Sequence, residues 1–171
     1  VEAGASIIGA DGGATVDHVR AIVLSVTDSR VGSHAKLVEV RSHAHDQAVE
    51  PPAPTVFHAN VGKRFLSTVE LDIPRGLDMS SVIEGARYLK GQGIDAVNIS
   101  DGARARLRMS PIAISRVVMD ETGMDCITHL ACRDRNMVGL QSEVLGAHAL
   151  GVRNILAVTV DQTHIGDFPG A

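Results

Sequence analysis

Four short apolar segments recur about every 30 residues in the second part of this chain, at 66–71, 96–99, 126–130 and 155–160. That interval is the length of one strand, one helix and the two connections between them. Because strands that alternate with helices are joined in parallel, the pattern predicts an α/β fold with a parallel sheet.

The segments between these runs carry the signals that start and stop helices. The expected N-terminal caps are Asp78, Ser110 and Asn136, and the expected stops are Gly93, Gly123 and Gly151. We expect the third helix to turn Met137, Leu140, Val144, Leu145 and His148 inward. A complete eight-stranded barrel needs about 250 residues. Residues 65–171 therefore correspond to a partial (β/α)8 TIM barrel of about the first four βα units.

An open set of parallel strands leaves an unpaired edge, which is a liability in a free-standing domain. We therefore expect either a fragment of a longer protein or half of an assembly, such as a homo-oligomer. This expectation concerns the organisation of the chain and leaves its chemistry open.

The N-terminal part is organised differently. A helical pattern covers 16–26, with Thr15 or Asp17 as its cap. The following segment is polar and rich in proline, which is typical of a linker. Its His43 and His45 are far more often solvated residues than metal ligands in such a segment. We expect the tail of another domain at 1–30, a linker at 31–64 and the partial barrel at 65–171.

Composition excludes several classes of partner. The net charge of −4 gives no electrostatic reason to expect nucleic acid. No apolar run reaches the roughly 18 residues of a membrane span, so we expect no membrane partner. The two cysteines are too few for a disulfide framework and indicate a reducing, cytoplasmic compartment. Cys126 and Cys132 are also poorly spaced for a zinc pair, so we expect small buried hydrophobic residues and no metal site.

Polar residues follow each predicted strand, at the sheet edge where α/β proteins bind ligands. They are Glu70, Asp72, Ser100, Asp101, His129, Cys132, Thr159 and Asp161. Two carboxylates on separate strands are suited to acid/base chemistry, but carboxylates are also common at strand ends as surface residues. From position alone, a hydrogen-bonded core histidine is the somewhat commoner interpretation of His129.

Two further signals concern phosphate and dinucleotides. The Arg133–Asp134–Arg135 cluster fits equally well a phosphate site beside a helix N-terminus and a solvated group of ion pairs. No Gly-x-Gly-x-x-Gly motif follows the first strand, which disfavours a Rossmann dinucleotide site.

Three stretches, in this order, resemble the methylenetetrahydrofolate reductases: Val-Glu-Leu-Asp-Ile-Pro-Arg-Gly at 69–76, His-Leu-Ala-Cys-Arg-Asp-Arg-Asn at 129–136, and 146–161. The resemblance implies a flavin-dependent TIM barrel that uses FAD and NAD(P)H to reduce 5,10-methylenetetrahydrofolate to 5-methyltetrahydrofolate in methionine metabolism. It implies Glu70 as the general acid and Asp161 as the group that stabilises the cationic iminium form of the folate. It also implies contacts to FAD from His129, Ser100, Val158, Thr159 and Val160.

The N-terminal region is similar to the tail of the homocysteine S-methyltransferase domain that precedes this reductase in some bifunctional bacterial proteins. That domain reads Gly-Gly-Cys-Cys-Gly where this chain has Gly-Ala-Asp-Gly-Gly at 9–13, so both zinc thiolates are absent. The reductases usually have Gly-Asp-Pro-Pro after the fourth strand, where this chain has Val160-Asp161-Gln162-Thr163. The alternative interpretation is a degenerate, non-catalytic relative that serves as a scaffold or interaction segment.

Overall fold

The computed structural model describes residues 8–10, 13–27, 51–102, 106–133, 135–159 and 167. The chain divides into two compact units. The first comprises Val1–Ala53 and Asn60–Phe65, and the second comprises Pro54–Ala59 and Leu66–Ala171. His43 and His45 lie outside the described residues.

The first unit contains the helix α1 (Val16–Thr27), as the sequence predicted. Thr15 is its cap: the Thr15 Oγ1 atom lies 3.5 Å from the backbone N–H of His18, and the Thr15 N–H donates to His18 Nδ1 at 3.0 Å. This pair of contacts follows the pattern of a capping box, with histidine in the place of the usual glutamate. Asp17 instead forms an ion pair with Arg20.

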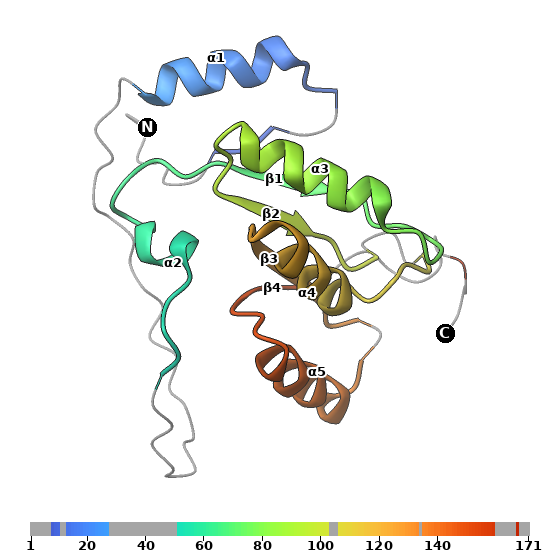
Figure 1. Cartoon of the computed structure of the whole chain (residues 1–171). Coiled ribbons are helices and arrows are strands. Elements are labelled where there is room, and N and C mark those ends of the chain that lie inside the picture. Colours follow the sequence, from blue (N-terminus) through green and yellow to red (C-terminus); the bar gives the residue numbers. More distant parts are fainter. Residues whose placement is uncertain are drawn as a thin grey trace. The chain divides into compact units, whose positions relative to one another are not determined.

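Strands and helices alternate through the second unit (Figure 1). After the short helix α2 (Val56–Asn60), the order is β1 (Thr68–Leu71), α3 (Ser80–Gly91), β2 (Ala96–Ile99), α4 (Pro111–Thr122), β3 (Asp125–Ala131), α5 (Met137–Ala149) and β4 (Asn154–Val158). Each strand lies within two residues of its predicted bounds. The prediction of an α/β fold is therefore confirmed.

The four strands form one parallel sheet in the order β1-β2-β3-β4. A doubly wound sheet changes direction at a switch point, but this order follows the chain throughout. Successive crossovers of one hand then place their helices on the same face of the sheet. This singly wound arrangement is consistent with part of a (β/α)8 barrel.

The core lies between the sheet and the helices α3 and α4. Its buried residues are Ile73, Val82, Ala86, Val97, Ile99, Ile114, Val118, Met124 and Cys126. Ser115 and Thr128 are polar and fully buried in this layer, where their hydroxyls share a 2.6 Å hydrogen bond. Each hydroxyl thereby satisfies the other in an apolar environment.

The predicted inward face of α5 is wrong for most of its residues. Met137, Val144 and Leu145 are exposed, Leu145 to 72%, and His148 is exposed as well. The helix instead buries Ala147, which joins Ile112 and Val152 in a second small core cluster. Apolar residues occur almost all round α5, so their spacing did not define a face. Ala147 is the residue of α5 that is buried.

Part of the predicted linker belongs to the second unit. The backbone N–H of Phe57 in α2 donates to Asp125 Oδ2 at 2.6 Å, and Thr55 Oγ1 donates to Asn154 Oδ1 at 3.2 Å. Asp125 and Asn154 are the first residues of β3 and β4. These contacts place α2 at the amino-terminal end of the sheet, opposite to the end where ligands bind in barrels.

Candidate functional site

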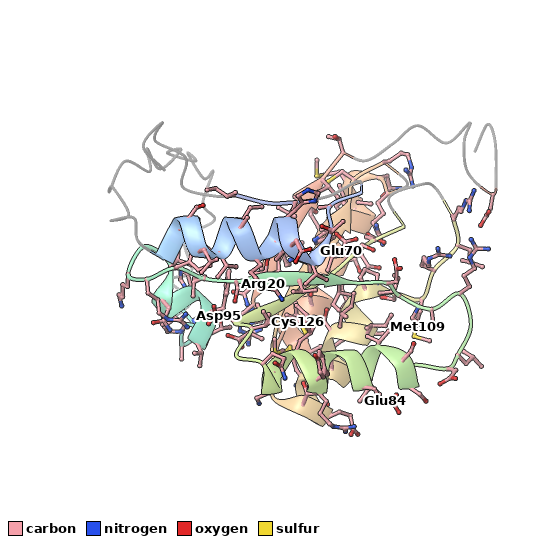
Figure 2. The ribbon with its side chains drawn as sticks, turned by 90° about the horizontal axis from the view of Figure 1, so that it is seen from above. Arg20, Glu70, Glu84, Asp95, Met109 and Cys126 are labelled. Atoms are coloured by element: carbon pink, nitrogen blue, oxygen red, sulfur yellow. The ribbon has the colours of Figure 1, made fainter. Side chains whose placement is uncertain are left out.

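Glu70, Asn98 and His129 lie on one face of the sheet, on three neighbouring strands. Glu70 and Asn98 are register partners, and His129 follows two residues after Ile127, the register partner of Asn98. Side chains alternate across a strand. Since the core residues Val97 and Ile99 flank Asn98, this face is opposite to α3 and α4. Figure 2 shows Glu70 on the far side of β1 from Glu84 of α3.

A ladder of hydrogen bonds crosses this face, which we call the polar face and define by Thr68, Glu70, Asn98 and His129. The Asn98 Nδ2 atom donates to Thr68 Oγ1 at 3.0 Å, and Asn98 Oδ1 lies 3.2 Å from His129 Nε2. One amide side chain therefore connects β1, β2 and β3. Sequence analysis missed Asn98 and Thr68, although a polar residue inside the apolar run 96–99 was a usable signal.

The ring of His129 is half-buried, and burial lowers its pKa. The negative charges of Glu70 and Asp101 oppose this effect without reversing it. A histidine whose pKa falls below its ordinary value of about 6.5 is neutral at neutral pH. His129 therefore offers one N–H donor and one acceptor nitrogen.

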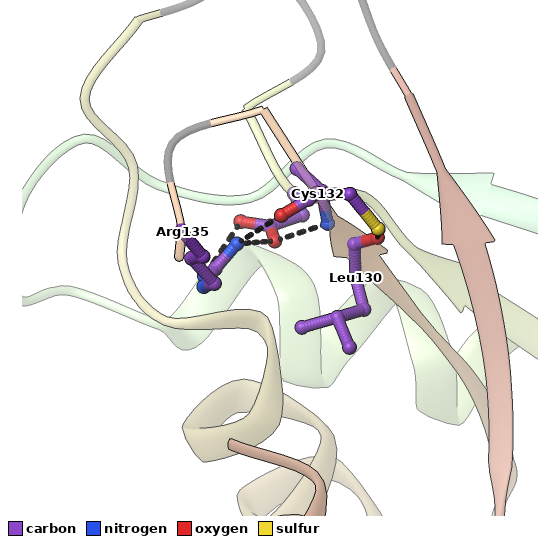
Figure 3. A network of polar contacts seen from close by, with 5 residues as sticks. Leu130, Cys132 and Arg135 are labelled. Atoms are coloured by element: carbon purple, nitrogen blue, oxygen red, sulfur yellow. Dashed lines mark hydrogen bonds and ion pairs between the residues drawn. The ribbon is translucent and has the colours of Figure 1, made fainter. Parts of the chain in front are cut away.

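Asp101 anchors the connection that follows β3 through its bonds to Ala131 and to Arg135, which Figure 3 labels. Its Oδ2 atom accepts from the Ala131 N–H at 2.8 Å and from Arg135 Nη1 at 2.6 Å. The same Arg135 nitrogen donates to the carbonyl oxygen of Ala131 at 2.8 Å. Both side chains are largely buried, with 13% of Asp101 and 22% of Arg135 exposed. Of the two interpretations of the arginine cluster, Arg135 fits the ion pair.

Some of the remaining predicted site residues lie within the described part of the chain, and others lie outside it. Glu70 is exposed, Ser100 is half-buried directly after β2, and Thr159 is exposed directly after β4. The carbonyl oxygen of Val158 accepts from the Cys132 N–H at 2.9 Å, which holds the ends of β3 and β4 together. Val160 and Asp161 lie outside the described residues. The structure thus brings Glu70 and His129 to one face.

Cys126 lacks the features of a reactive thiol. Cys126 is buried, and burial raises the pKa of its thiol to about 12. Within the described residues, no group of three or more His, Cys, Asp or Glu side chains could hold a metal ion. The helices in the described ranges are all too short or too polar to cross a membrane.

Comparison with known proteins identifies the family. The family model described as methylenetetrahydrofolate reductase matches residues 57–168. The matched range includes all of the strands, the polar face and the Asp101–Arg135 pair. A comparison with curated proteins gave no match. Since the family match covers well over half of the chain, this protein belongs to the methylenetetrahydrofolate reductase family.

Proposed function

We propose that the second unit is part of an FAD-dependent enzyme that reduces 5,10-methylenetetrahydrofolate to 5-methyltetrahydrofolate with NAD(P)H. The observation that carries this proposal is the polar face, where Glu70 and His129 come together within the matched range. A barrel with its general acid on the face opposite the helices has that acid directed toward the barrel interior. The family acts on folate, and this chain retains the carboxylate that the chemistry needs.

The residues of the polar face suit a flavin ring better than a phosphate. Glu70 brings a negative charge, and Arg135 is engaged by Asp101. A neutral His129, the half-buried Ser100 and the backbone at Val158 and Thr159 supply hydrogen-bonding groups without a positive charge. Uncharged donors and acceptors match an uncharged heterocycle, while a pyrophosphate needs cations or a helix N-terminus.

In this proposal a bound FAD would supply the hydride-transfer chemistry between NAD(P)H and the folate. Glu70 donates a proton to the folate nitrogen as the imidazolidine ring opens, which is general acid catalysis. Asp161, on sequence grounds, stabilises the resulting cation by its negative charge. Ser100, His129, Val158, Thr159 and Val160 hold the flavin in place.

The first experiment is a titration of the purified chain with FAD, followed by flavin fluorescence. A bound flavin permits two rates to be separated: its reduction by NAD(P)H and its reoxidation by methylenetetrahydrofolate. We expect Glu70→Gln to slow the folate step by at least about 100-fold and to leave the nicotinamide step unchanged, because the proton is needed only by the folate.

Asp72→Asn is the matched control, since Asp72 is an exposed carboxylate two residues further along. It should leave both rates within about twofold of the parent chain. Equal loss in the two variants, or an equal effect of Glu70→Gln on both steps, would contradict the role of Glu70 as a general acid.

A non-catalytic scaffold is the second candidate function, and Val160 is the observation that favours it. Glycine at this position in the family permits close backbone approach or a positive φ, which a β-branched residue disfavours. If Val160 obstructs the flavin, Val160→Gly should tighten FAD binding. No flavin binding by either form would favour the scaffold over the reductase.

We infer a bifunctional parent protein, with the tail of a methyltransferase-like domain at 1–30, a linker at 31–64 and a cytoplasmic location. The Asp at position 11 cannot supply two soft zinc ligands, so no methyl transfer is proposed for this chain.

A further inference from the structure

We infer that Asn98 is a positioning residue that holds His129 in one tautomer, so that the ring presents a hydrogen-bond acceptor to the ligand. This inference rests on the proposed function for the identity of the ligand, but its first step depends only on the ladder Thr68–Asn98–His129.

The orientation of the Asn98 amide sets the direction of each hydrogen bond. Asn98 Nδ2 donates to Thr68 Oγ1, so the Oδ1 atom faces His129 Nε2 at 3.2 Å. An amide oxygen can only accept. The Nε2 atom of His129 must therefore carry the hydrogen, and in the neutral ring Nδ1 is left as an acceptor.

Burial of the ring keeps this arrangement in place at neutral pH. Among the described residues, the charged groups that act on His129 are Glu70 on β1 and Asp101 after β2, and β4 contributes Leu156 as the register partner. Burial lowers the pKa of the ring despite both carboxylates, so the acceptor nitrogen stays unprotonated. Asp101 is itself neutralised by Arg135.

The consequence concerns which part of a ligand His129 can contact. An acceptor nitrogen pairs with a hydroxyl or an imide N–H, and it repels the oxygens of a phosphate. His129 therefore selects the donor groups of FAD, namely the imide of the ring system or the sugar-like hydroxyls. The pyrophosphate must lie elsewhere.

A contact of His129 with a donor group of FAD and a contact with its phosphate predict opposite effects of pH on FAD affinity. If Nδ1 accepts from a ligand donor, protonation of His129 removes that bond, and FAD affinity should fall about tenfold as the pH drops through the lowered pKa of His129. If the ring contacts phosphate, affinity should rise over the same range. His129→Gln should remove the dependence.

The tautomer is measured on the ligand-free chain by NMR with ¹⁵N-labelled histidine, and His129→Gln assigns the signal among the eight histidines. We expect Nε2 protonated in the parent chain. Asn98→Leu should mix the tautomers and weaken FAD binding about tenfold. Thr68→Val is nearly isosteric at an exposed position, and should give a smaller change in the same direction because it frees the amide to rotate.

The role of Asn98 would be overturned by a His129 ring that is protonated at Nδ1 in the parent chain. It would also be overturned if the tautomer stayed the same in Asn98→Leu and Thr68→Val. Tighter FAD binding at low pH would overturn the acceptor contact. An Nε2–H ring that becomes a mixture of tautomers in Asn98→Leu, in a chain that binds no FAD, would confirm the positioning by Asn98 and contradict the proposed function, so the two failures are distinguishable.

Discussion

Single residues affect the stability of this protein mainly where a buried polar group has one hydrogen-bond partner. Ser115 and Thr128 are 0% and 1% exposed, and their hydroxyls bond to each other at 2.6 Å. Replacing one leaves the other without this partner. We expect Ser115→Ala or Thr128→Val alone to cost about 1–2 kcal/mol of unfolding free energy.

The double variant should restore much of that loss, because two apolar groups then face each other. A urea denaturation series on the parent, the two single variants and the double variant measures the coupling. Additive losses would show that the shared hydrogen bond does not account for the cost.

Asp101 is the second residue of this kind, because it joins the end of β2 to the segment after β3. Asp101→Ala removes the acceptor for the Ala131 N–H and leaves Arg135 without its carboxylate. We expect a loss of about 2 kcal/mol, below the range for a fully buried pair because both side chains retain some exposure. Asp101→Asn keeps an acceptor and should cost about half as much.

The control is Glu121→Ala, which breaks the exposed pair with Arg87. Surface pairs contribute at most about 1 kcal/mol, so this variant should unfold close to the parent. An equal loss in Glu121→Ala and Asp101→Ala would contradict the anchoring role of Asp101.

Among the elements, α5 depends most clearly on its cap. The Asn136 side chain accepts from the Gly139 N–H at 2.8 Å, whereas Ser110 begins α4 without a side-chain cap bond. Asn136→Ala should therefore cost about 1 kcal/mol, and Ser110→Ala close to nothing. Thermal denaturation of both variants measures the difference, and similar shifts in Tm would contradict it.

The same helices show how far sequence can predict elements. Alternation, glycine stops and the asparagine cap located every strand and helix of the sheet layer, because these signals are local. The buried face of α5 was not predictable, since its orientation depends on how closely Ala147 approaches Ile112. The partnership of Asn98 with His129 depends on register across strands, which a single sequence does not contain.

At the scale of the whole molecule, the sheet needs residues that precede its first strand. Unit 2 includes Pro54–Ala59, in which Phe57 of α2 and the preceding Thr55 bond to the first residues of β3 and β4. A chain that starts at residue 54 keeps both contacts and should unfold like the full chain if the second unit is independent.

A chain that starts at residue 66 loses a hydrogen bond to the Asp125 carboxylate and another to Asn154. The expected loss is about 2–3 kcal/mol relative to the chain that starts at 54, because the bond to a charged group contributes most. Asp125→Asn should cause part of this loss in the chain that starts at residue 54. It should cause little loss in the chain that starts at residue 66. Equal stability of the two truncated chains would show that 54–65 acts as a linker, and the boundary of the barrel would then lie at 65.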